Sequence, residues 1–141
     1  MAGRTATPQD DEGSILLLVL GYALLALALI LVCVSATDLY IAQKRLDALA
    51  DTAALAAADD YELVVTDGQP RAELAGDDVR ARAAEMVAAD ERGATLVSAD
   101  TPDGVSARVV VSDTWHPPLV SLFVPDGVNL VSTSTSRTAI G

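Results

Sequence analysis

The stretch RLDALADTAALAAAD, residues 45–59, decides how the chain is organised. It contains no glycine or proline, and the strong helix formers alanine and leucine make up most of it. Upstream, residues 15–36 form a run without a charged side chain, and about 20 apolar residues suffice for a helix to cross a bilayer core of about 30 Å. We therefore predict one helix over residues 15–58, about 65 Å long at about 1.5 Å per residue, that crosses a membrane and continues beyond it.

The composition divides the chain into three parts. These are a short polar tail over residues 1–14, the long helix over residues 15–58 and a small extracytoplasmic domain over residues 59–141. The formal net charge of -11 argues against a nucleic-acid partner and against attraction to anionic lipid headgroups. The single cysteine, Cys33, lies in the apolar run, which excludes an internal disulfide and a zinc site built on cysteine pairs.

A cleaved signal peptide is the alternative interpretation of the apolar run. Signal peptides begin with a basic region and have an apolar core of about 7 to 15 residues. Here acidic residues 10–12 precede a longer run, and Arg4 is the only basic residue ahead of it. Residues 34–36, Val-Ser-Ala, do resemble a cleavage site, but we predict an uncleaved anchor. Lys44 and Arg45 follow the run, so charge alone does not settle which way the chain crosses the membrane.

A stripe of apolar and small residues is predicted to follow one face of the long helix. Its members recur at steps of three, four or seven residues, which is a heptad pattern. The stripe consists of Gly21, Leu25, Ala28, Val32, Leu39, Ala42, Leu46, Leu49, Ala53 and Ala56. Small residues let helix backbones approach closely, which favours association inside lipid. We predict that the stripe packs against other subunits, with packing on the chain's own C-terminal domain as the alternative.

The segment over residues 12–59 resembles the N-terminal segment of TadE/TadG-like proteins, which belong to the tight-adherence (Flp) pilus-assembly systems of bacteria. The residues that match the family pattern are Gly13, Ser14, Asp38, Tyr40, Arg45, Asp51 and Leu55, together with the alanines around Leu55. The pattern departs from processed pilins, because the fifth residue after Gly13 is Leu18 and the fifth after Gly3 is Pro8, where those pilins carry Glu.

The resemblance implies a minor pilin or pilus-assembly component in the bacterial cytoplasmic membrane. It implies a single-pass protein with its N-terminus in the cytoplasm and its C-terminal domain outside. Its expected partners are the lipid bilayer and other pilin-like or pilus-assembly membrane subunits. A membrane-tethered extracytoplasmic binding or sensor module unrelated to pili is the alternative function.

Asp38 stands at the outer edge of the apolar run. Burial of its carboxylate in hydrocarbon costs several kcal/mol, about 2.5–3.5 on insertion scales, so Asp38 is predicted to fix the depth of the span. It could also pair with Arg45 of a neighbouring subunit, or remain a solvated carboxylate.

The outer domain is predicted to be α+β, with one helix packed on an antiparallel sheet of three or four strands. The helix is expected over about residues 77–91, with Asp77 as its N-cap, and Val79, Ala83, Met86 and Val87 on its buried face. The strands are expected at 94–99, at 105–113, where apolar and polar residues alternate, and at about 128–138, with a turn at 101–104.

The sequence contains no motif that indicates an enzyme. His116 is the only histidine, and one histidine without neighbouring cysteines makes a poor metal site. We therefore expect no catalytic residues, no metal, no cofactor and no small-molecule substrate. Trp115, Leu122 and Phe123 in the loop over residues 115–127 are the candidates for a surface contact, and covering the sheet is the alternative role for them.

Overall fold

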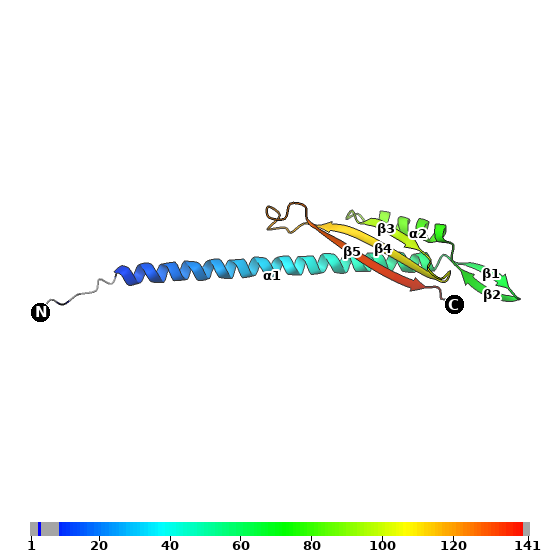
Figure 1. Cartoon of the computed structure of the whole chain (residues 1–141), viewed down its shortest axis with the longest axis horizontal. Helices are drawn as coiled ribbons and strands as arrows, with labels where there is room; N and C mark the ends of the chain where they lie inside the picture. Colours follow the sequence, from blue (N-terminus) through cyan, green and yellow to red (C-terminus); the bar gives the residue numbers. More distant parts are fainter. Residues whose placement is uncertain (1–2, 4–8, 140–141) are drawn as a thin grey trace. The chain divides into compact units, whose positions relative to one another are not determined.

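The computed structural model describes residue 3 and residues 9–139. Its elements are α1 (Gln9–Ala58), β1 (Glu62–Thr66), β2 (Gln69–Glu73), α2 (Gly76–Ala88), β3 (Thr95–Asp100), β4 (Ser106–Trp115) and β5 (Val128–Arg137), as Figure 1 shows. The chain divides into two compact units, Met1–Thr37 and Asp38–Gly141. The predicted α+β class is confirmed, with one long apolar helix, a second helix and two antiparallel sheets.

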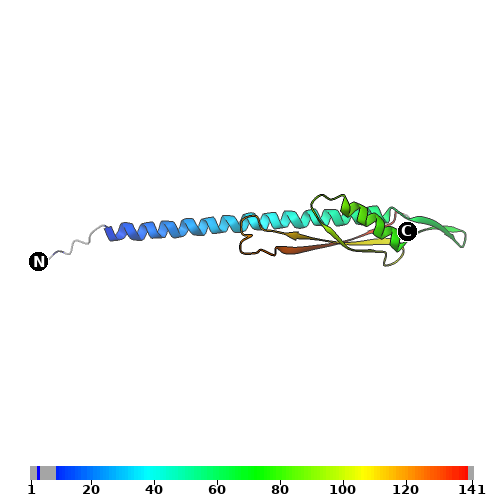
Figure 2. The ribbon, with the colours of Figure 1, turned by 90° about the horizontal axis from the view of Figure 1, so that it is seen from above.

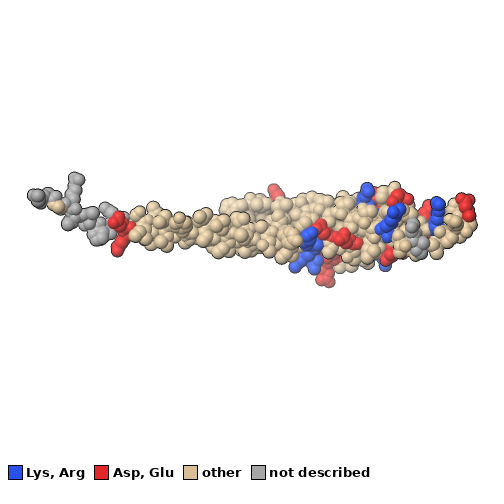
Figure 3. Space-filling view, turned by 90° about the horizontal axis from the view of Figure 1, so that it is seen from below, with Lys and Arg blue, Asp and Glu red and all other residues tan. Residues whose placement is uncertain are grey.

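The first unit contains the apolar part of α1. Residues 13–37 include no charged side chain, and Figure 3 shows this stretch as a surface without acidic or basic groups. Within the described residues, α1 is the one helix long and apolar enough to cross a membrane, with a mean hydropathy of 3.1 over its most apolar window. None of that window is buried by the chain, whereas the core helix of a soluble protein would be mostly covered.

Helix α1 begins at Gln9, ahead of the predicted start at Ile15. Acidic residues are favourable at this end, because the free backbone N–H groups give a helix N-terminus partial positive charge. Asp11 and Glu12 lie in these first turns, so the polar residues ahead of the apolar run extend the helix rather than end it.

The second unit is built on a three-stranded antiparallel sheet in the order β3-β4-β5. In the central strand β4, Ala107, Val109 and Val111 are buried and Arg108 between them is exposed, which confirms the predicted alternation. Val109 lies opposite Ser134 of β5, so the inward face continues onto that strand. One face of the sheet therefore carries the core.

Two helices cover that inward face. Val79, Ala83 and Val87 of α2 are buried, as predicted, and the part of α1 in the second unit adds alanines without exposed surface. The buried cluster consists of Leu46, Ala50, Ala53, Ala54, Ala57, Ala58, Leu74, Val79, Ala83, Val87, Ala99, Ala107, Val109, Val111 and Leu130. Figure 2 shows the layers from above. Because alanine lacks a long side chain, the backbone of α1 can lie close to the sheet.

The predicted N-cap of α2 is wrong. The capping position is Ala75, without a side-chain hydrogen bond, and Asp77 lies with Asp78 in the first turn. Acidic side chains are also favourable there, through the helix dipole. The helix ends at Ala88, earlier than predicted, where the N–H of Ala89 bonds to Glu85 O.

A separate hairpin of β1 and β2 is not among the strands that the sequence pattern predicts. Asp67 and Gly68 both have positive φ angles, 55° and 76°, as two-residue hairpin turns require. Pro70 of β2 pairs with Val65 of β1. Proline in a strand is confined to edges or strand ends, and it masks the strand pattern in the sequence.

The predicted turn at 101–104 is confirmed, and Asp103 organises it. Asp103 Oδ1 accepts hydrogen bonds from the N–H groups of Val105 (3.1 Å) and Ser106 (2.7 Å). Ser106 Oγ donates to Asp103 Oδ2 at 2.9 Å, and Ser106 is buried beside this turn. The Val105 N–H, followed by the Ser106 hydroxyl, lowers the pKa of Asp103.

Candidate functional site

The predicted stripe on α1 has two different environments. In the first unit Gly21, Leu25, Ala28 and Val32 are all exposed. In the second unit Leu46 and Ala53 are buried, while Leu39, Ala42, Leu49 and Ala56 are half-buried. The outer half of the stripe thus has its packing partner within the chain, and contact of the stripe with other subunits stays a prediction.

A polar network fixes the sheet against α1 beside this stripe. Asp47 Oδ1 accepts hydrogen bonds from Gln43 Nε2 at 2.9 Å and from Ser132 Oγ of β5 at 2.7 Å. Gln43 Nε2 also donates to Val131 O at 3.3 Å, and Lys44 Nζ lies 3.5 Å from Asp47 Oδ2. The Gln43 and Ser132 hydrogen bonds hold the pKa of Asp47 below its ordinary value.

The network predicts a pH-dependent stability. Since the folded state lowers the pKa of Asp47, its contribution is present above the unfolded pKa and is lost as pH falls through the folded pKa. Asp47→Asn should lower the free energy of unfolding by about 1 kcal/mol at neutral pH, a small value because the carboxylate is partly exposed. Chemical unfolding from neutral to acidic pH checks this, and a deficit that does not shrink in acid contradicts it.

Asp38 has a partner within the chain. Its Oδ2 accepts a hydrogen bond of 2.7 Å from Nε1 of Trp115, at the end of β4. Hydrogen bonds to a charged acceptor are stronger than neutral ones. Trp115 is half-buried and packs against the core cluster, so this contact ties the end of the sheet to the residue that follows the apolar run.

The loop over residues 116–127 presents two side chains to solvent. Leu122 is 91% exposed and Phe123 is 84% exposed. The base of the loop is close-packed, because Pro117 is fully buried. A Cβ on Gly127, whose φ is +70°, would lie 2.8 Å from Thr114 Cγ2 and from Trp115 O. The loop therefore has a fixed base and an apolar tip, and Trp115 belongs to the base.

The other residues that match the family pattern lie on exposed surface. Gly13 and Ser14 are exposed in the first unit. Tyr40, Asp51 and Leu55 are exposed on α1 in the second unit, on the side that the sheet does not cover. These positions are free to meet lipid, water or another protein.

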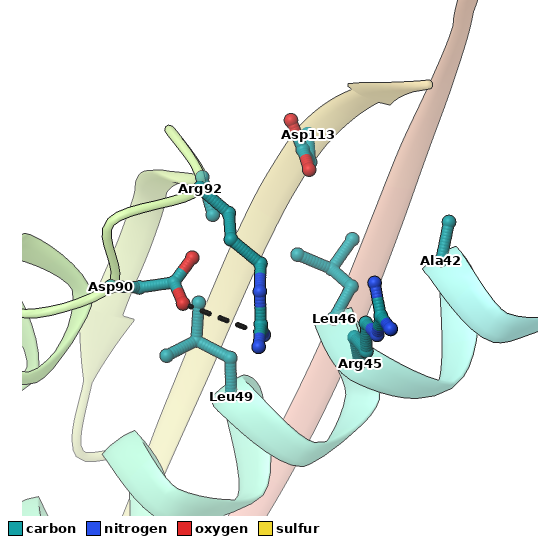
Figure 4. Close-up of a pocket in the computed structure, with 8 residues that line it drawn as sticks. Ala42, Arg45, Leu46, Leu49, Asp90, Arg92 and Asp113 are labelled. Atoms are coloured by element: carbon teal, nitrogen blue, oxygen red, sulfur yellow. Dashed lines mark ion pairs between the residues drawn. The ribbon is translucent and has the colours of Figure 1, made fainter. Parts of the chain in front are cut away.

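A small cavity lies between α1 and the segment after α2, as Figure 4 shows. Its volume is about 90 Å³, and it is lined by Ala42, Arg45, Leu46, Leu49, Asp90, Arg92, Ala94 and Asp113. Arg92 Nη1 lies 3.7 Å from Asp90 Oδ1, so Arg92 and Asp90 form an ion pair with each other. Ligand pockets usually have about 300–1,000 Å³, and this one is too small for a cofactor.

The described residues contain no group of three or more His, Cys, Asp or Glu side chains placed to hold a metal ion. His116 is exposed at the start of the loop. Large exposed apolar side chains lie on α1 and at the tip of the loop.

The exposed apolar helix and the folded unit that follows it fit a single-pass membrane protein. The family model described as "Putative Flp pilus-assembly TadE/G-like" matches residues 13–60, which confirms the resemblance for that segment and associates the chain with Tad/Flp pilus assembly. That family is a structural and assembly family that is not known as enzymatic. The match covers most of α1 and none of the strands. No curated protein and no solved structure matches the chain.

Proposed function

We propose that this protein is a membrane-anchored, minor pilin-like or assembly component of a Tad/Flp-type pilus or related secretion apparatus. It acts by helix packing in the membrane and by surface contacts of its outer domain, with the N-terminus in the cytoplasm. The observation that carries the proposal is the family match over residues 13–60, the same segment that holds the exposed apolar helix. Because the chain does not cover the most apolar part of this helix, the side chains there are available to lipid and to other helices.

Gly21 is the best candidate for a helix contact in the membrane. A Cβ added to Gly21 would meet no other atom of the chain within 4 Å. Its missing side chain leaves an open depression lined by Ser14, Leu17, Leu18, Tyr22 and Leu25. Close packing at small residues is a main source of helix association in lipid, so a partner helix is expected to approach here.

Gly21→Leu tests this packing without disturbing the chain's own fold. The variant should reduce co-isolation with the neighbouring pilus-assembly subunits about tenfold, which corresponds to about 1.4 kcal/mol. Ala23→Leu is the matched control, because it adds similar bulk at nearly the same depth on the opposite helix face. Crosslinking and co-purification from the native membrane measure the effect. Equal recovery for both variants would contradict packing at Gly21.

A further inference from the structure

We propose that the tip of the loop over residues 116–127, Leu122 and Phe123, inserts into the membrane interface. The outer domain then has a second, shallow contact with lipid in addition to its helical anchor. This inference rests on the membrane anchoring in the proposed function, and it is independent of any role in a pilus.

The loop is tied to the level where the apolar run ends. Asp38 follows residue 36, the last of the run, by two positions in a continuous helix, so it lies about 3 Å further along the axis. Trp115 donates its 2.7 Å hydrogen bond to Asp38, and Val128 is paired with Trp115 across β4 and β5. Both ends of the loop are therefore held close to the membrane boundary that Asp38 marks.

The loop leaves the sheet in the direction of lower residue numbers in α1. In β5, Val131 O contacts Gln43, whereas Val128 lies beside Trp115 and hence near Asp38. The three residue steps from Val131 to Val128 in β5 cover about 10 Å, and the five steps from Gln43 to Asp38 in α1 cover about 7.5 Å. These segments of β5 and α1 therefore run side by side over similar lengths. The loop continues past this end of the sheet, as Figures 1 and 2 show within the second unit.

The chemistry of the loop suits the interface. Residues 117–125 carry no charge, and Leu122 and Phe123 are the most exposed large apolar side chains in the part of the chain that the structure describes. Trp115 and the exposed Tyr40 stand near Asp38, and such aromatic residues are enriched at membrane interfaces.

The backbone at the tip is already partly satisfied. The N–H groups of Phe123 and Val124 both donate to Val120 O, at 2.9 and 3.2 Å. Unpaired backbone groups are costly in hydrocarbon, so these bonds reduce the cost of leaving water. With a net charge of -11, the chain is not drawn to anionic headgroups, and contact through apolar side chains with neutral lipid is the mode that fits.

Fluorescence of the full chain in phosphatidylcholine vesicles tests the inference. With Cys33 replaced by alanine, a cysteine at Phe123 carries an environment-sensitive dye, and lipids with a nitroxide near the headgroup act as quenchers. Phe123→Cys should show blue-shifted emission and strong quenching. Val65→Cys is the matched control, because Val65 is also apolar and 71% exposed but lies in the β1–β2 hairpin, and it should show neither effect.

A second variant and the native cysteine complete the test. Adding Leu122→Asp should abolish the quenching at position 123, because a charged tip is expelled from the interface. Dye on native Cys33 reports the anchor and should be quenched by lipids with a deep nitroxide. If the dye is quenched at Cys33 but no more at position 123 than at position 65, the anchor stands and the contact of the loop with lipid is overturned. That result favours a protein as the contact partner of the loop tip. Absence of quenching at Cys33 as well overturns both the anchor and the inference.

Discussion

Replacing Ala53 by aspartate should remove much of the stability of the second unit. Ala53 has no exposed surface and lies in the cluster formed by α1, α2 and the inward face of the sheet. An uncompensated buried charge costs about 3–5 kcal/mol, against a total stability of about 5–15 kcal/mol for a domain of this size. The substitution also adds volume where the helix lies close to the strands, and overpacking adds to the cost.

Ala48→Asp is the control for this prediction, because Ala48 is exposed on the same helix and the same change there costs at most about 0.7 kcal/mol of helix propensity. Trp115 is the only tryptophan in the chain, so its fluorescence reports the sheet even when the detergent-bound part of α1 stays helical. Thermal unfolding of the detergent-solubilised full chain should show a large loss for Ala53→Asp and almost none for Ala48→Asp. Equal melting temperatures would mean that α1 does not pack on the sheet.

Placing arginine at both Leu25 and Ala28 should release the chain from the membrane. These residues lie near the middle of the apolar run, and each arginine at a helix centre opposes insertion by about 2.5–3.5 kcal/mol. Both positions are exposed in the first unit, so the chain itself offers the charges no partner. The measurement is the share of the protein that remains in carbonate-washed membranes.

The same two charges at Ala36 and Thr37 are the control for the anchor. At the end of the run a long arginine side chain reaches the headgroup region and keeps its charge hydrated. This pair should stay in the membrane fraction while the central pair leaves it. If the two pairs partition alike, the apolar run does not span the bilayer in the predicted frame.

The sequence predicts those features that depend on neighbouring residues. The long helix follows from the unbroken apolar and alanine-rich pattern, the strand β4 from its alternation, and the turn at Asp103 from its turn residues. The buried face of α2 follows from helical periodicity. Its N-cap does not, because the local backbone geometry, which composition does not specify, decides whether Ala75 or Asp77 occupies the capping position.

The contacts that place the candidate surfaces are long-range, and no local pattern encodes them. Asp38 and Trp115 are separated by 77 residues, and Asp47 and Ser132 by 85. Each of these residues alone suits a solvated position. Their pairing depends on the register between α1 and the sheet, which only the folded chain defines. The sequence identifies Leu122 and Phe123 as a candidate contact, but only the Asp38–Trp115 pair shows at which level of α1 the loop begins.

The central claim is that residues 15–36 remain in the chain as a membrane span, with the second unit outside the cytoplasm. The most direct measurement is labelling of single cysteines, in a Cys33→Ser background, with a membrane-impermeant maleimide on intact spheroplasts. Leu55→Cys is exposed in the second unit and should be labelled, whereas Ser14→Cys should be protected until the cells are opened, both on full-length chains in the membrane fraction. Labelling of Ser14→Cys with protection of Leu55→Cys, or recovery of a shortened chain free of the membrane, would contradict the account.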